Sequence, residues 1–168
     1  EEINEKIIEK VQQGIFEIGI CFEPPVNHQL IFQPLFQEDF LALVPKDHAL
    51  AQQQKVTWSE LCAHPFITLQ NPSIIRHIIE ENCHKNQMVL DLKVECHQIS
   101  SLSHFVAFGM GVSAIPRRFQ HFIDQQQNVL IELVEGEIPP PVGIIYQKDT
   151  ELSNASAEFI DIMLKHHF

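Results

Sequence analysis

Apolar residues recur along this chain at two different spacings, and each spacing predicts a type of element. Four of them near the N-terminus stand three or four positions apart: Ile3, Ile7, Ile8 and Val11. This spacing predicts an amphipathic helix over residues 2–13, which Gly14 ends. The next segment, residues 15–22, is mostly apolar and rich in strand-forming residues, as is typical of a strand buried on both faces of a sheet.

The same two patterns alternate to the end of the chain. The capping box Thr57–Glu60 predicts the start of a short helix, and Ser73 stands where another helix begins. We expect helices over residues 2–13, 58–63, 74–86, 101–109 and 117–127 and from about residue 153. We expect strands at residues 15–22, 30–36, 40–45, 65–69, 90–99, 112–116, 128–134 and 142–149. Strands separated by helices in this way are typical of α/β proteins.

The stretch "FVAFGMGVSAIP", residues 105–116, has two glycines between a predicted helix and a predicted strand. We expect Ser100 or Ser101 to cap the helix, the helix to run into Gly109, and Gly111 to adopt the left-handed conformation. In dinucleotide sites the glycines follow a strand and open a helix, whereas here the order is reversed. The stretch is therefore interpreted as a packing turn and not as a phosphate cradle.

Composition and charge limit the possible partners. The chain has 168 residues, 45% of them hydrophobic, and a net charge of −11 from 22 acidic and 11 basic residues. Because nucleic-acid affinity depends on basic residues that neutralise phosphates, we expect no DNA or RNA binding by this segment alone. No apolar run approaches the ~18–20 residues that cross a bilayer, and the acidic N-terminus is unlike a signal sequence. These features predict a cytoplasmic protein without membrane contact.

Four cysteines, Cys21, Cys62, Cys83 and Cys96, form no C-x-x-C pair and are predicted to be reduced, mostly buried thiols. The two adjacent Cys-His pairs are poor chelators, because neighbouring residues on a strand point to opposite faces, so we expect no metal and no cofactor. The chain contains no G-x-S-x-G, H-E-x-x-H or P-loop sequence. No sequence motif singles out one cysteine and one histidine as a catalytic pair, and we do not expect an enzyme.

Six segments, taken in order, resemble the effector-binding (regulatory) domain of LysR-type transcriptional regulators. They are "VQQGIFEIGI", "PLFQEDFLALVPKDHALA", "WSELCAHPFITL", the helix with Arg76, "FVAFGMGVSAIPR" and "VGIIYQKD" with the last helix. The resemblance implies two Rossmann-like lobes, as in type 2 periplasmic binding proteins. Lobe I would be residues 1–40 and 148–168, and lobe II residues 41–147. Lobe I would be incomplete, because the family domain normally begins with a further strand, helix and strand.

The resemblance also implies a function and partners. A small-molecule effector, here expected to be a carboxylate or another anion, would bind between the lobes. DNA would be bound only through an N-terminal winged helix-turn-helix that is absent from this chain, and the full-length regulator would self-associate as a dimer or tetramer. Strand ends, helix starts and the glycine turn supply the candidate effector-binding residues. They are Asn4, Cys21, Phe22, Thr68, Gln70, Asn71, Ser73 and Met110.

Two other binding functions stay open. A solute-binding protein of a transport system would share the fold, although a leader and often disulfides would be expected of an exported protein. A peroxide sensor is the second alternative, because such members of the family carry two cysteines that flank the helix with the Arg76 equivalent. Cys83 matches the second of these cysteines, but the first position is Ile74. Without that partner thiol, we expect Cys83 to be structural.

Overall fold

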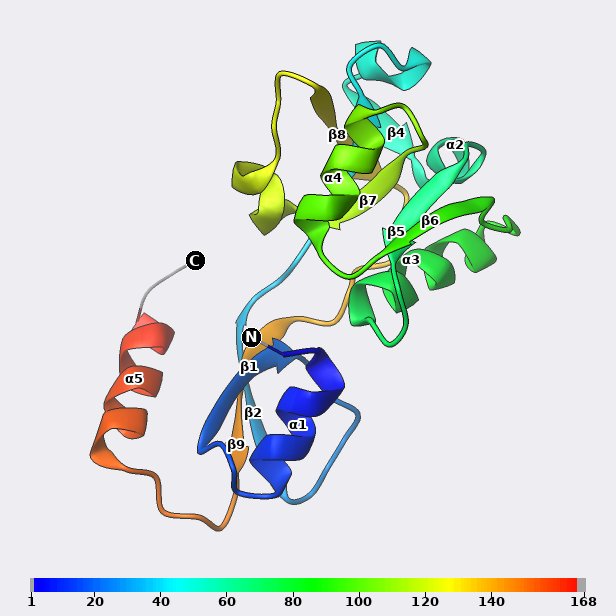
Figure 1. Cartoon of the computed structure of the whole chain (residues 1–168). Coiled ribbons are helices and arrows are strands. Elements are labelled where there is room, and N and C mark those ends of the chain that lie inside the picture. The colour runs from blue at the N-terminus through cyan, green and yellow to red at the C-terminus, as the bar shows by residue number, and fades with distance from the viewer. Residues whose placement is uncertain (1, 166–168) are drawn as a thin grey trace. The chain divides into compact units, whose positions relative to one another are not determined.

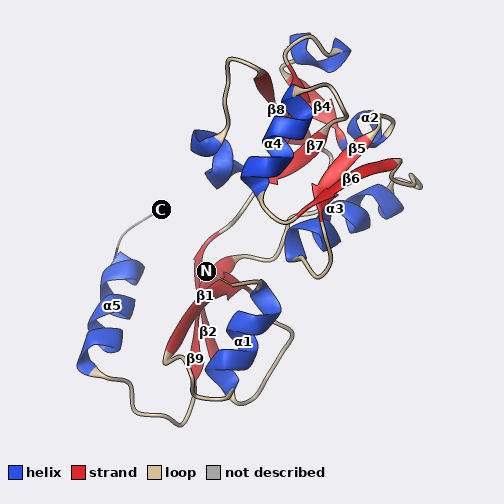
Figure 2. Ribbon diagram, in the orientation of Figure 1, coloured by secondary structure: helices blue, strands red, loops and turns tan. Residues whose placement is uncertain are grey.

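The structure is a computed structural model that describes residues 2–165, so residue 1 and residues 166–168 of the predicted first lobe lie outside the described part. Its helices are α1 Asn4–Gln12, α2 Trp58–Cys62, α3 Ile74–Lys85, α4 Ile99–Ala107 and α5 Asn154–Lys165, with 3₁₀ helices η1 Ala49–Gln52 and η2 Arg117–Phe122 (Figure 1). Its strands are β1 Ile18–Phe22, β2 Leu30–Phe36, β3 Phe40–Pro45, β4 Lys55–Thr57, β5 Phe66–Leu69, β6 Leu92–Cys96, β7 Ser113–Pro116, β8 Asn128–Val134 and β9 Val142–Gln147. Figure 2 separates the two kinds of element by colour. The predicted α/β class is confirmed.

The chain divides into two compact units, one made of Glu1–Glu38 with Pro139–Phe168 and the other of Asp39–Ile138. In the first unit, β9 lies between β1 and β2 and is antiparallel to both. The sequence-based boundary at residue 148 had put this strand in the second lobe. The observed boundary lies earlier because both hydrogen-bonded partners of β9 belong to the first unit.

Helix α1 covers one face of this three-stranded sheet. Val11 on the helix packs with Cys21 and Ile145 on the strands, and all three side chains are buried. The thiol of Cys21 is surrounded by apolar groups, and this burial raises its pKa to about 12. The apolar stripe that predicted the helix therefore faces the sheet.

The second unit contains two groups of strands. One is a four-stranded sheet in the order β4-β8-β3-β7, and the other is the parallel pair β5-β6. A core formed by these strands and α4 includes Leu43, Ile67, Leu69, Cys96, Leu102, Val106, Ile115 and Ile123. The predicted helix over residues 117–127 was wrong, because only the 3₁₀ segment η2 forms there and Ile123 beyond it is extended.

The glycine turn differs from the prediction in detail. Helix α4 ends at Ala107, and Gly109 has the left-handed backbone, with φ of 75°. Gly111 is needed for another reason, because a Cβ there would lie 2.5 Å from the carbonyl oxygen of Pro65. The roles expected of the two glycines are therefore partly reversed: the first turns the chain, and the second lets it pass close to the start of β5.

Two of the four cysteines were predicted wrongly. Cys62 and Cys83 form a disulfide that joins α2 to α3, whereas Cys21 and Cys96 are free and buried as expected. The disulfide partner of Cys83 is therefore Cys62, from the preceding helix. Among residues 2–165, no helix combines the length and the apolar character needed to cross a membrane.

Candidate functional site

Strands β5 and β6 end side by side, and each leads into a helix. In their parallel register Leu69 is paired with Cys96, the last residue of each strand, and the N–H of Gln70 donates to the carbonyl oxygen of Cys96 at 2.8 Å. Helix α3 begins soon after β5, and α4 begins soon after β6. Two helix N-termini therefore start from the same edge of this strand pair, which in open α/β sheets is the edge where ligands bind.

The two helix N-termini differ in how they are capped. The hydroxyl of Ser73 accepts a hydrogen bond from the N–H of Arg76 at 3.4 Å, so Ser73 is the N-cap of α3. Gln98 is the residue that precedes α4, and its side chain makes no capping hydrogen bond. Because α4 begins at Ile99, the predicted caps Ser100 and Ser101 both lie inside the helix. Unpaired N–H groups and the helix dipole favour negative charge at such ends.

Thr68 lies next to this edge and is fully buried. Its hydroxyl oxygen has no hydrogen-bond partner within the described part of the chain, a property that it shares with side-chain oxygens of Gln33 and Asn128 elsewhere. A buried polar group left in this state costs about 1–3 kcal/mol. The neighbours of Thr68 along the strand, Ile67 and Leu69, belong to the core with α4, so Thr68 points to the opposite face.

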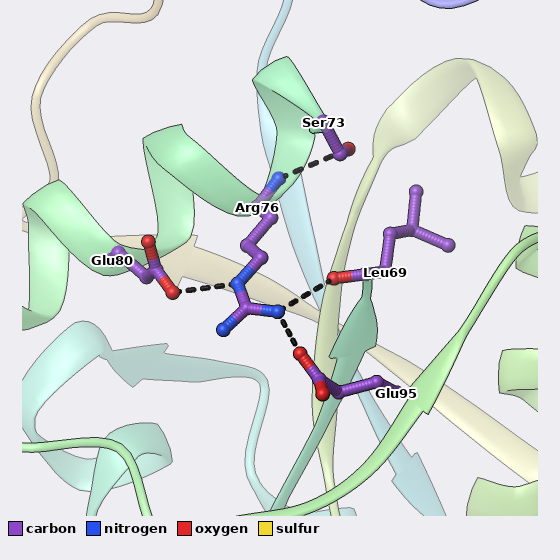
Figure 3. A network of polar contacts seen from close by, with 5 residues as sticks. All are labelled: Leu69, Ser73, Arg76, Glu80 and Glu95. Atoms are coloured by element: carbon purple, nitrogen blue, oxygen red, sulfur yellow. Dashed lines mark hydrogen bonds and ion pairs between the residues drawn. The ribbon is translucent and has the colours of Figure 1, made fainter. Parts of the chain in front are cut away.

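Arg76 ties the start of α3 to both strands (Figure 3). Its Nε donates to Glu80 at 2.6 Å, its Nη1 forms an ion pair with Glu95, and the same nitrogen lies 3.5 Å from the carbonyl oxygen of Leu69. Burial of the guanidinium works against its charge, but the hydrogen bonds and charges of the two carboxylates outweigh that effect and raise the pKa of Arg76. Arg76 is therefore a charged residue that fixes the turn between β5 and α3.

Of the predicted residues, Thr68 lies in β5, and the turn that leads from β5 to α3 contains Gln70, Asn71 and Ser73. Gln70 and Asn71 are exposed, and Asn71 precedes Pro72 through a cis peptide bond. Met110 lies beyond the opposite end of α4, where its side chain is 47% exposed, and it is not grouped with the turn.

The other predicted residues lie in the first unit. The side-chain oxygen of Asn4 accepts a hydrogen bond from the N–H of Phe22 at 2.9 Å, so these two residues are in contact and join α1 to the end of β1. Cys21 lies in the core under α1 and is only 4% exposed, so its thiol does not face solvent. The thiol of Cys21 therefore contributes to the core of the first unit.

Sequence reasoning missed three residues at the β5-β6 edge: Arg76, Glu95 and Gln98. Glu95 is paired in register with Thr68, and Gln98 had been included in a strand that was predicted to run to residue 99. The serines that follow Gln98 were the available signal for a helix start, but they were taken as the caps themselves. The position of Glu95 depends on which residues of β5 and β6 are paired, and local sequence does not specify this.

The two-unit α/β fold is of a kind that binds ligands at strand ends, and comparison with known proteins identifies the family. The family model described as LysR substrate binding domain matches residues 1–167. An uncharacterized HTH-type transcriptional regulator of Escherichia coli (strain K12), YbhD, is 31% identical over 148 residues, which is 88% of this chain and 47% of the relative. The chain therefore belongs to the LysR substrate-binding domain family, as its sequence motifs predicted.

Further relatives are also regulators. The transcriptional dual regulator GltC of Bacillus subtilis (strain 168) is 24% identical over 160 residues, covering 95% of this chain and 53% of GltC. The chain spans about half the length of the curated relatives that it matches. These matches favour a regulatory effector-binding domain over a solute-binding protein of a transport system.

Solved structures of LysR-type regulatory domains have the same fold as this chain. The effector-binding domain of QuiR in complex with shikimate has a TM-score of 0.86 and 17% identity, covering 99% of this chain and 78% of that one. The CcmR regulatory domain of Synechocystis PCC6803 in complex with 2-PG has a TM-score of 0.85 and 20% identity, covering 96% and 78%. These likenesses confirm the predicted type 2 periplasmic-binding-protein-like fold.

Proposed function

We propose that this domain senses a small carboxylate, or a similar anion, at the edge where β5 and β6 lead into α3 and α4. The observation that carries the proposal is the fully buried hydroxyl of Thr68, which has no partner in the described part of the chain and lies beside the capped start of α3. An effector oxygen there would accept the hydrogen bond that Thr68 lacks. The N–H groups at the two helix ends would stabilise its negative charge.

The relatives support a sensing role, and a structural neighbour supports the choice of ligand. Because the relatives are named as transcriptional regulators, the effector would be bound and released unchanged, and the domain would not be an enzyme. Shikimate, which is bound by the QuiR domain, is a carboxylate. Asn4 and Phe22, which are in contact in the other unit, remain candidate effector-binding residues.

In the whole protein, effector binding would control a separate DNA-binding domain. The net charge of −11 on this chain opposes contact with DNA phosphates, so DNA would be bound outside it. Self-association of the full-length regulator and a cytoplasmic location, where DNA is accessible, complete the proposal.

Replacing Thr68 by valine tests the site, because valine keeps the shape and removes only the hydroxyl. We expect Thr68→Val to raise the free energy of unfolding without ligand by about 1 kcal/mol, since it removes a buried unpaired hydroxyl. We also expect it to weaken carboxylate binding about tenfold to a hundredfold, the loss of one hydrogen bond to a charged group. Urea unfolding without ligand and calorimetric titration with shikimate, benzoate and other small carboxylates measure the two effects.

Ser153→Ala is the matched control for a lost helix cap, because the hydroxyl of Ser153 accepts a hydrogen bond from the N–H of Ser156 at the start of α5, which belongs to the other unit. It should reduce stability by ~1 kcal/mol and leave carboxylate affinity unchanged. Ser73→Ala, which removes the cap of α3, should reduce both. Equal carboxylate affinities in wild type and Thr68→Val would place the effector elsewhere.

A further inference from the structure

Glu95 lies beside the candidate site and points toward it. It is paired with Thr68 in the parallel register, and paired residues of adjacent strands have their side chains on the same face. That face is the one on which Arg76 reaches from α3, as the ion pair between Arg76 and Glu95 shows (Figure 3). Half of the Glu95 side chain remains exposed, so its negative charge is accessible to a ligand at this edge.

The charges at this position do not balance. Arg76 supplies one positive charge, and Glu80 and Glu95 each supply a negative one through direct ion pairs with it. The three side chains therefore carry a net charge of −1. The Nε and Nη1 atoms of the guanidinium already bind carboxylates, so two negative charges face the single positive charge of Arg76 before an effector arrives.

The two helix ends supply positive potential at the edge, about half an elementary charge for each helix. This is enough to hold one carboxylate that reaches the N–H groups. A second carboxylate on the same ligand would approach the net negative charge of Arg76, Glu80 and Glu95.

We propose that Glu95 sets the charge selectivity of the site, so that the domain accepts an effector with one negative charge and rejects one with two. The proposal rests on the proposed function, because it assumes that an anion binds at this edge. Glu95 is then a specificity-determining residue. It repels a second carboxylate of the ligand directly, and its ion pair with Arg76 compensates the charge of the guanidinium.

Benzoate and isophthalate provide a matched pair of probes, since they share the aromatic ring and differ by one carboxylate. Wild type should bind benzoate at least about tenfold more tightly than isophthalate, the effect expected of one unpaired charge at a partly exposed site. In Glu95→Gln the amide oxygen still accepts from Arg76 while the negative charge is lost. We expect the preference to fall to about threefold or less, mainly because isophthalate binds better.

Glu81→Gln is the control, because Glu81 lies on the same helix as Arg76, has a similarly exposed side chain, and pairs with His77 instead of Arg76. It removes the same charge from the chain and should leave the preference unchanged. Glu80→Gln removes the other carboxylate bound to Arg76 and should reduce the preference as Glu95→Gln does, which provides a second variant. Melting temperatures without ligand verify that each variant is folded.

The outcomes separate the two proposals. If benzoate binds and the preference over isophthalate is the same in wild type, Glu95→Gln and Glu80→Gln, the role of Glu95 is refuted while the anion site stands. If benzoate and isophthalate both fail to bind wild type at millimolar concentration, the anion site is refuted and the role of Glu95 with it. A smaller preference in both variants, with Glu81→Gln like wild type, supports the proposal.

Discussion

Replacing Cys62 and Cys83 together by alanine is expected to lower the free energy of unfolding by about 3 kcal/mol. The two residues are 21 positions apart and joined by a disulfide, and a cross-link that closes a loop of this length restricts the unfolded chain by about this amount. The bond also attaches α2, which has only five residues, to the longer α3. Equilibrium urea unfolding of the oxidised wild type and the double variant measures the difference.

Reduction of the wild type with dithiothreitol should reproduce most of this loss, because it breaks only that bond. Cys21 and Cys96 are free, so reduction should not alter them, and a Cys96→Ala variant should show the same sensitivity to reduction as wild type. Identical unfolding curves for the oxidised and reduced wild type would contradict the disulfide.

The two helices that the disulfide joins also contact the connection that leads from β8 to β9. Trp58 of α2 packs so closely against Gly136 that a Cβ there would lie 2.0 Å from the indole nitrogen. On α3, the side-chain oxygen of Asn82 accepts a hydrogen bond from the N–H of Glu137 at 2.8 Å, and Lys85 pairs with the Glu137 carboxylate. The two helices joined by the disulfide therefore contact adjacent residues of the connection, Gly136 and Glu137.

Gly111→Ala is expected to be the most damaging single substitution in the glycine turn, at about 3 kcal/mol. The new Cβ would lie 2.5 Å from the carbonyl oxygen of Pro65 and 3.0 Å from its carbon. That oxygen accepts the N–H of Val112 at 2.8 Å, so relieving the clash would pull apart a backbone hydrogen bond in the core. Urea unfolding of the variant measures the cost.

Gly109→Ala is the comparison for Gly111→Ala. Its Cβ would have no atom within 4 Å, but the left-handed φ of 75° costs an alanine roughly 1–2 kcal/mol. A larger loss of stability in Gly109→Ala than in Gly111→Ala would contradict the assignment of their roles.

The sequence predicted elements whose pattern is local. The stripe on α1, the apolar run of β1 and the capping box of α2 each depend on neighbouring residues, and the structure has all three elements. The segment 117–127 failed because polar residues and a run of glutamines allow either a helix or a 3₁₀ turn. The left-handed backbone was assigned to Gly111 instead of Gly109 because the sequence does not determine whether α4 ends at residue 107 or 109.

The candidate site could be predicted only as far as one strand and the helix after it. Thr68 and Ser73 lie at a single strand-to-helix junction, which the sequence shows. The closeness of Glu95 to Arg76 depends on pairing between β5 and β6, and the Cys62–Cys83 bond depends on the packing of α2 on α3. Both are contacts between residues far apart in sequence, and no spacing of residues encodes them.

Binding of an anion where β5 and β6 lead into α3 and α4 can be mapped residue by residue, from the backbone amide shifts of the ¹⁵N-labelled chain as benzoate or shikimate is added. The largest shifts are expected at residues 68–76 and 97–101, and these shifts should saturate together with a single affinity. Saturable shifts confined to other residues, or no saturable shift with any small carboxylate, would contradict it.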